Sequence, residues 1–122
     1  MEYPYQSIVA FSASKGMKHI LFATKRATRK YINLKDKVQV SVFIDNRSNQ
    51  EADFSDATGM TALGDARELA GTSKKKFMRP FLRKHPYFEG FLSSPDCALF
   101  MIKVKVYYVV WHFHEVLEVR IK

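Results

Sequence analysis

Residues 99–113 read LFMIKVKVYYVVWHF, a long run that is rich in β-branched and aromatic residues. Residues of these types favour a strand over a helix, and side chains along a strand alternate between its two faces. One face is expected to carry Ile102, Val104, Val106, Tyr108 and Val110. The run therefore predicts a long strand in a β-rich protein.

The rest of the chain is predicted to form shorter strands, separated by turns and short helices. Residues 38–44 alternate apolar and polar side chains, which predicts a strand with one buried face. Residues 60–69 predict another strand, in which Gly64 marks a bulge or a close approach of two backbones. The other expected elements are a hairpin over 4–24 with strands at 4–12 and 19–23, a helix over 26–33, a loop over 46–56, one or two short helices over 73–86 interrupted at Pro80, and a last strand over 116–121 that extends residues 99–113 or folds back.

These elements follow one another in the order β-β-α-β-β-α-β-β. Strands that are neighbours in sequence can pair by hairpins, which favours an antiparallel sheet over parallel βαβ winding. The expected fold is mainly β, an antiparallel barrel or rolled sheet with short helices, as one domain over residues 1–122.

The composition indicates a globular protein of a reducing compartment. Of the 122 residues, 47% are hydrophobic and 26% charged, as is usual for globular domains. Cys97 is the one cysteine, so no internal disulfide can form, and no apolar run reaches the roughly 20 residues of a transmembrane helix. The first residues lack the basic start and apolar core of a signal peptide, so the cytoplasm is the expected location. The net charge of +8 attracts nucleic acid, anionic membranes or phosphorylated small molecules, and charge alone does not choose among them.

The segment at residues 22–30, FATKRATRK, ends one predicted strand and opens a helix. Helix N-termini present unpaired backbone N–H groups and the positive end of the helix dipole, so they bind phosphate readily. Two threonine hydroxyls and four cations lie in this segment, and arginine and lysine both bind phosphate oxygens. The pattern fits a phosphate cradle, and it equally fits a solvated basic helix on a basic protein.

An ordered set of motifs resembles the FMN-binding split-barrel family of pyridoxamine 5′-phosphate oxidase. The set is Pro4-Tyr5-Gln6-Ser7-Ile8-Val9, then Lys15-Gly16-Met17, Phe22-Ala23-Thr24, Thr28-Arg29-Lys30 and a Val-rich strand. The strong similarity covers residues 4–44, and Gly64 with Ala66, His85-Pro86 and the long strand near the C-terminus are similar to later landmarks. The resemblance implies an antiparallel, Greek-key-like split barrel.

The resemblance also implies a cofactor, a site and a partner. Thr24, Thr28, Arg29 and Lys30 would hold the phosphate of FMN, and its ring would lie against residues 8–10 (Ile8, Val9 and Ala10). Family members are typically homodimers with flavin sites at the subunit interface, so Trp111 and Phe113 would face the partner's flavin. The implied activity is FMN-dependent oxidation or reduction of an unknown small substrate, in which the cofactor carries the chemistry. No general acid or base can be named.

The sequence departs from the true oxidases at several positions. Ser7 stands where they carry arginine, and Ser12 stands about where they carry lysine. Their C-terminal substrate segment, with Trp and Arg-x-His, has no counterpart. The helix and strand that usually precede the Pro-Tyr segment in the family also have no counterpart here, so one wall of the barrel is expected to be incomplete. Efficient oxidation of pyridoxamine 5′-phosphate is therefore not expected.

Two other functions remain open at this level. One is a binding module that holds haem, as some relatives do, or a flavin without turnover. The other is a nucleic-acid-binding barrel with Phe and Tyr as stacking surfaces, which the placement of most aromatic residues within apolar runs disfavours. His112 and His114 are expected to share a strand face, but the sequence offers no further ligands to complete a metal site. The lysine run at 74–76 is typical of a solvated helix. His19 and His85 are expected to be structural, and Cys97 is expected to serve packing.

Overall fold

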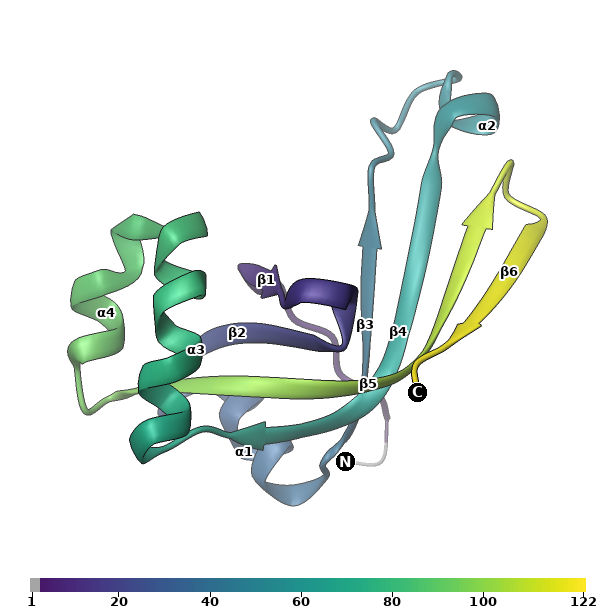
Figure 1. Ribbon diagram of the computed structural model, residues 1–122. Helices are drawn as coiled ribbons and strands as arrows, with labels where there is room; N and C mark the ends of the chain where they lie inside the picture. The colour runs from purple at the N-terminus through teal and green to yellow at the C-terminus, as the bar shows by residue number, and fades with distance from the viewer. Residues whose placement is uncertain (1–2) are drawn as a thin grey trace.

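The computed structural model describes residues 3–122 as one antiparallel sheet with helices beside it (Figure 1). The strands are β1 (Phe11–Ala13), β2 (His19–Lys25), β3 (Gln39–Asp45), β4 (Thr58–Glu68), β5 (Cys97–Trp111) and β6 (Glu115–Arg120). The α-helices are α1 (Arg29–Asp36), α2 (Asp53–Asp56), α3 (Gly71–Lys84) and α4 (Glu89–Ser93), with 3-10 turns η1 (Lys15–Met17) and η2 (Pro86–Phe88). The predicted mainly β, antiparallel class is confirmed.

The long strand β5 organises the sheet. Its partner along one edge is β4, and β3 lies beyond β4. Along the other edge β2 pairs with the first half of β5, from Cys97 to Lys103, and β6 pairs with the second half, from Val106 to Trp111. Strand β6 therefore folds back on β5, and β1 extends the sheet beyond β2. Within residues 3–122 no ladder joins β3 to β1 or β6, so the sheet is rolled but not closed.

The bulge expected at Gly64 is confirmed, and it changes which side chains of β5 share a face. Leu63 pairs with Val106 and Gly64 with Val104, so Lys105 has no partner in β4. A bulged residue reverses the alternation beyond it. Ile102 and Val104 consequently share the inner core with Tyr107. The single face predicted for Ile102, Val104, Val106, Tyr108 and Val110 is therefore wrong beyond residue 104.

Two apolar layers lie on opposite faces of the sheet. The inner face packs around Phe22, Phe100, Ile102 and Tyr107. The outer face of β2 and the first half of β5 is covered by α3 and α4, whose Phe81 and Leu92 are almost fully buried there. No helix among residues 3–122 has the length and apolar character needed to cross a membrane.

Four of the expected elements differ in the structure. Residues 4–10 lie outside the sheet, and β1 pairs with β2 only from Phe11; before it, the Ile8 carbonyl accepts a hydrogen bond from the Lys30 side chain. Helix α1 begins at Arg29 and not at residue 26, since Thr28 caps it. Helix α3 continues through Pro80, because tertiary packing on both sides of the proline outweighs the hydrogen bond that it removes. The expected loop at 46–56 also contains α2.

Replacing Ser12 with Ala is expected to leave the free energy of unfolding unchanged or to raise it by about 1 kcal/mol. The Ser12 side chain is 5% exposed, and its hydroxyl has no hydrogen-bond partner in the described residues. It lies on the same face as Leu21, in the layer under α3, where removing an unpaired hydroxyl removes its desolvation cost. Urea unfolding of the two proteins measures the difference, and a loss of 1 kcal/mol or more would show that the hydroxyl is paired.

Candidate functional site

Two threonines shape the turn that leads into α1. The Thr28 hydroxyl accepts a hydrogen bond from the Tyr31 backbone N–H (3.2 Å) and donates to the Lys25 carbonyl (2.8 Å). The Thr24 hydroxyl, which is buried, lies 3.1 Å from that of Thr28. These bonds fix the helix start, and the backbone N–H groups of Arg29 and Lys30 are left without an acceptor in residues 3–122. The first turn of α1 therefore has the free donors that bind an anion.

Lys30 joins this helix start to the N-terminal segment. Its Nζ donates to the carbonyl oxygen of Ile8 at 3.1 Å, across 22 positions of sequence. Burial lowers the pKa of Lys30. The Ile8 side chain is 95% exposed, while Val9 packs against the inner core and Ala10 is half-buried. The structure therefore brings together both parts of the predicted site, residues 8–10 and the first turn of α1.

Arg29 contacts the same N-terminal segment. Its guanidinium lies 5.8 Å from the centre of the Tyr5 ring, at a distance that allows a cation–π contact. Tyr5 was not predicted as a site residue, and only its position in the Pro-Tyr motif distinguishes it in the sequence. Exposed Arg29 and half-buried Lys30 thus both contact residues 5–8, a segment that has no strand partner among residues 3–122.

Arg26, another cation of this segment, turns away to a charged network under α1. Its Nη1 lies 2.6 Å from Glu68 Oε2 and 2.9 Å from the Tyr31 hydroxyl, and its Nε donates to the Pro95 carbonyl at 3.0 Å. The Tyr31 hydroxyl and Lys35 also reach Glu68 Oε1, at 3.0 and 3.3 Å. Burial raises the pKa of Glu68, but hydrogen bonds from Arg26, Tyr31 and Lys35 together outweigh it, so the net shift is downward. The network fastens α1 to β4 and to the start of β5.

Glu68→Gln is expected to lower the free energy of unfolding at pH 7 by about 1–2 kcal/mol, since a charged acceptor is lost but solvent screens the partly exposed pair. A carboxylate whose pKa is lowered by folding stabilises the protein above its unfolded pKa of about 4.3, and this stabilisation is lost as the pH falls through the folded pKa. The variant should therefore differ from the native protein at pH 7 and converge with it near pH 2. Urea titrations across this range test this, and parallel curves for the two proteins would contradict it.

The aromatic and histidine residues near the C-terminus lie at the other end of β5. Trp111 ends that strand, whereas Thr24 of the helix start pairs with Ala98 at its beginning. In one chain the predicted ring contacts Trp111 and Phe113 are therefore remote from the cradle. The turn after Trp111 has left-handed backbone at His112 (φ 51°) and Phe113 (φ 59°), and the Phe113 ring packs edge-on against Phe54 at 5.1 Å.

The remaining candidates have local partners. His112 Nδ1 lies 3.1 Å from Glu115, and His114 Nδ1 lies 2.6 Å from the His112 carbonyl. Across residues 3–122 no group of three His, Cys, Asp or Glu side chains could hold a metal ion. His85 Nε2 lies 2.8 Å from the Phe11 carbonyl and joins α3 to β1. Cys97 is buried in the outer layer, where burial raises the pKa of its thiol.

Comparison with known proteins bears on the fold. No protein-family model matches the sequence, and no curated protein does. A haem-binding protein from Mycobacterium smegmatis matches 97% of this chain with a TM-score of 0.83 and 14% identity, over 48% of its own length. This chain thus spans about half of that protein.

Two further solved structures cover most of their own length. A pyridoxine phosphate oxidase family protein from Clostridium acetobutylicum, related to general stress protein 26 of Bacillus subtilis, matches 98% of this chain and 80% of its own, with a TM-score of 0.64 and 17% identity. An FAD-binding protein from Mesorhizobium loti matches 88% of this chain and 77% of its own, with a TM-score of 0.65 and 21% identity. The chain therefore has the split-barrel-like fold found in the pyridoxine phosphate oxidase family.

Proposed function

We propose that the chain binds FMN and holds its phosphate at the first turn of α1. The observation that carries this proposal is the convergence of Lys30 Nζ, the Arg29 side chain and two acceptor-free backbone N–H groups beside residues 8–10. A phosphate dianion accepts from all of these donors and is stabilised by the positive end of the helix. Lys30 Nζ now bonds a neutral carbonyl, which is a weaker acceptor than a phosphate oxygen.

The threonines have a supporting part in this proposal. The Thr28 hydroxyl already donates to the Lys25 carbonyl and accepts from the Tyr31 N–H, so its main part is to hold the shape of the turn. Buried Thr24 acts through Thr28. Arg29 and Lys30 are therefore the main side-chain contacts of the phosphate, and residues 8–10 present the exposed Ile8 side chain to the flat ring.

Binding at this site competes with the N-terminal segment. A phosphate bound by Lys30 replaces the Ile8 carbonyl as its hydrogen-bond partner, and one bound by Arg29 removes that side chain from Tyr5. Within the described part of the chain, residues 5–8 have no strand partners that would hold them in place. Ligand binding is thus coupled to release or rearrangement of this segment.

The chemistry that bound FMN supplies is transfer of a hydride or of single electrons. The chain's own residues bind the phosphate, orient the ring and exclude water from one side of it. Ser12 stands where the oxidases carry lysine, yet its side chain points into the layer under α3 and is 5% exposed. This placement supports the expectation that pyridoxamine 5′-phosphate is not the substrate.

The proposal includes a homodimer in a reducing compartment such as the cytoplasm. Trp111 and Phe113 lie at the far end of β5 from the cradle, so they reach a flavin only in another copy. The single thiol, Cys97, is buried and free, as suits a reducing compartment.

Haem binding is the second candidate, and one observation favours it. His112 and His114 lie at an exposed turn beside Phe113 and Phe54, which are 54% and 70% exposed. An imidazole beside exposed aromatic rings is the combination that a haem needs, an iron ligand and an apolar face.

The absorption spectrum of the purified protein separates these functions. Added FMN should bind and give flavin bands that stay with the protein on gel filtration. A Soret band that forms with haem and is lost in the His112→Ala/His114→Ala protein would instead support the second candidate. Retention of neither chromophore would reject both.

A further inference from the structure

Helix α3 carries most of the chain's excess positive charge. It lies against the outer face of the sheet, with α4 beside it (Figure 1). Of the chain's 20 Lys and Arg residues, six lie within residues 69–88, whereas none of its 12 Asp and Glu residues does. This stretch therefore supplies six of the eight net positive charges of the chain. Blocks of like charge of this size often belong to interaction segments.

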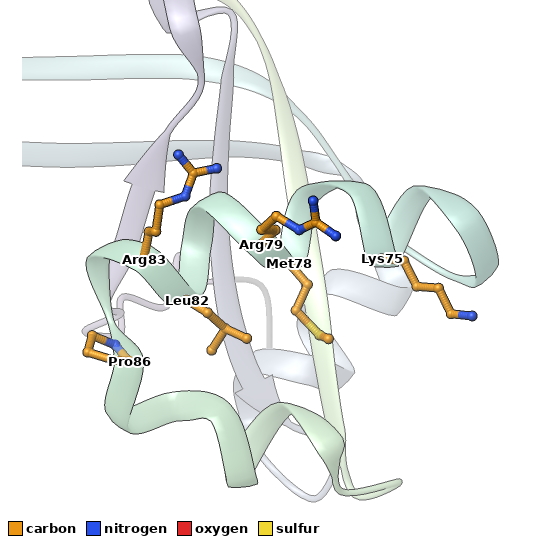
Figure 2. A pocket seen from close by; sticks show the side chains of 6 residues that line it. All are labelled: Lys75, Met78, Arg79, Leu82, Arg83 and Pro86. Atoms are coloured by element: carbon orange, nitrogen blue, oxygen red, sulfur yellow. The ribbon is translucent and has the colours of Figure 1, made fainter.

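An open hollow of about 640 Å³ lies along the outward side of α3. Three basic and three apolar side chains line it, each set at four-residue spacing: Lys75, Arg79 and Arg83, and Met78, Leu82 and Pro86. Figure 2 shows Arg79 and Arg83 on one side of the helix and Met78 and Leu82 on the other. The three cations are exposed, whereas Met78 and Leu82 are half-buried because they also pack against the outer layer. The α3 hollow thus has a basic row beside an apolar row.

The basic row has no counter-charge within the described part of the chain. No carboxylate of residues 3–122 forms an ion pair with Lys75, Arg79 or Arg83. Like charges four residues apart destabilise a helix. An anionic partner would therefore remove a cost that the isolated chain carries.

The surroundings of the hollow are also positive. The His19 ring of β2 packs edge-on against Phe77 of α3 at 5.8 Å. Burial lowers the pKa of His19, and four nearby cations lower it further: Lys103, Arg67, Lys18 and Lys76. A field of one sign speeds the approach of an oppositely charged partner. The charges on this side of the molecule thus favour an anionic ligand.

The form of the hollow distinguishes among anionic partners. Binding to a membrane surface needs apolar side chains that insert into it, whereas Met78 and Leu82 are half-buried beside exposed cations. Single-stranded nucleic acid needs free aromatic faces on which bases stack. The exposed ring beside the hollow, Tyr87, packs against Phe88 with 4.9 Å between ring centres, and its hydroxyl lies 3.1 Å from His85 Nδ1. Two parallel rows, one charged and one apolar, instead fit an elongated protein segment.

We propose that the α3 hollow binds an acidic amphipathic helix of a partner protein. Carboxylates at every fourth residue of such a helix recur about every 6 Å, which is the spacing of Lys75, Arg79 and Arg83 along α3. An apolar row next to the carboxylates would lie against Met78 and Leu82. Docking of an amphipathic helix into a groove is a recurring mode of peptide recognition.

This contact is separate from the proposed FMN site. The α3 hollow is on the outer side of the sheet, whereas α1, whose first turn forms the cradle, packs on the inner side through Tyr31 and Leu34. Both sites can therefore be occupied at once, and failure of one proposal leaves the other standing.

A labelled synthetic peptide of about 20 residues, long enough to form a helix, tests the contact by fluorescence anisotropy. It has glutamate at every fourth position, leucine at every fourth position of the adjoining row, and alanine and glutamine elsewhere. The native protein should bind this glutamate probe at micromolar concentrations. In the variant Lys75→Glu/Arg79→Glu/Arg83→Glu like charges face each other, so binding should weaken by about 100-fold or more. The same peptide with lysine in place of glutamate should bind that variant and not the native protein.

Three controls separate this contact from general attraction between charges. The variant Lys15→Glu/Lys37→Glu/Lys122→Glu carries the same change of charge at exposed positions outside α3, and it should bind the glutamate probe as tightly as the native protein. A glutamate probe with glutamine in place of leucine keeps its charge and should bind at least about 10-fold more weakly. Circular dichroism and urea midpoints identify any loss of folding, and Arg79→Glu alone, which changes only the middle of the row, should weaken binding by about 10-fold.

The opposite results overturn the proposal. One is a native protein that does not bind the glutamate probe at micromolar concentrations, and another is a folded triple variant that binds it unchanged. Equal affinity for the glutamate probes with and without leucine overturns the assignment of an amphipathic helix, because the apolar row then has no part in binding. If a single-stranded oligouridylate or phosphatidylserine vesicles bind through α3 more tightly than the probe, the partner is a nucleic acid or a membrane and not a protein helix.

Discussion

Lys30→Ala is expected to weaken FMN binding by about 10- to 150-fold, because a charge-assisted hydrogen bond to phosphate contributes roughly 1.5–3 kcal/mol. Lys30 is half-buried beside acceptor-free backbone donors of α1, and Arg29 alone cannot replace its position. The variant loses no hydrogen bond inside the sheet, since among residues 3–122 the Lys30 side chain bonds only the Ile8 carbonyl of the N-terminal segment. Fluorescence titration of both proteins with FMN measures the effect.

Three controls separate the phosphate contact from other causes. Riboflavin has no phosphate, so it should bind weakly to both proteins and lose little on mutation. Lys37→Ala removes the same charge at an exposed position just beyond α1 and should leave FMN affinity unchanged. Thr28→Ala should show a smaller loss than Lys30→Ala, through a weakened helix cap. Equal FMN affinity of the native and Lys30→Ala proteins would reject the phosphate site while leaving the fold intact.

The strands were predictable where the signal is local. Residues 38–44 alternate with period two, and β3 forms at Gln39–Asp45 with Val40, Val42 and Ile44 against the core. Gly64 marked the bulge, because a glycine inside a strand pattern signals a close approach. Its consequence for the partner strand was not predictable, since nothing in the 99–113 pattern shows that Lys105 is the unpaired residue.

The candidate site was predictable only in part, because its contacts are not local. The start of the helix and the cations beside it could be predicted from residues 24–30, but the spacing of the cations does not show which of them would face a ligand. Arg26 is drawn away by Glu68, which lies 42 positions later and has no signal in the sequence. That Lys30 and Ile8 belong to one site was implied by the resemblance to the split-barrel family and not by periodicity, and their direct hydrogen bond was not predicted. The strand expected over residues 4–12 was only partly right. The apolar run of this N-terminal segment is typical of a strand, but only Phe11–Ala13 joins the sheet.

The second large effect is expected at the bulge itself. Gly64→Ala should lower the free energy of unfolding by about 3 kcal/mol, at the upper end of what overpacking a core usually costs. A Cβ at Gly64 would collide with the backbone carbonyl of Lys103 and lie 2.9 Å from the Ile102 side chain. Flexible side chains can move aside, but the carbonyl belongs to the central strand, so β4 and β5 would have to separate.

Gly90→Ala is the matched control, because the same methyl group is added to α4 where nothing lies within 4 Å. There alanine should be neutral or stabilise the protein by up to about 1 kcal/mol, since it lowers the entropy of the unfolded chain. Urea unfolding of the three proteins gives the comparison. If Gly64→Ala unfolds within 0.5 kcal/mol of the native protein, roughly the range of a neutral surface change, then β4 does not approach β5 as closely at this glycine as the structure describes.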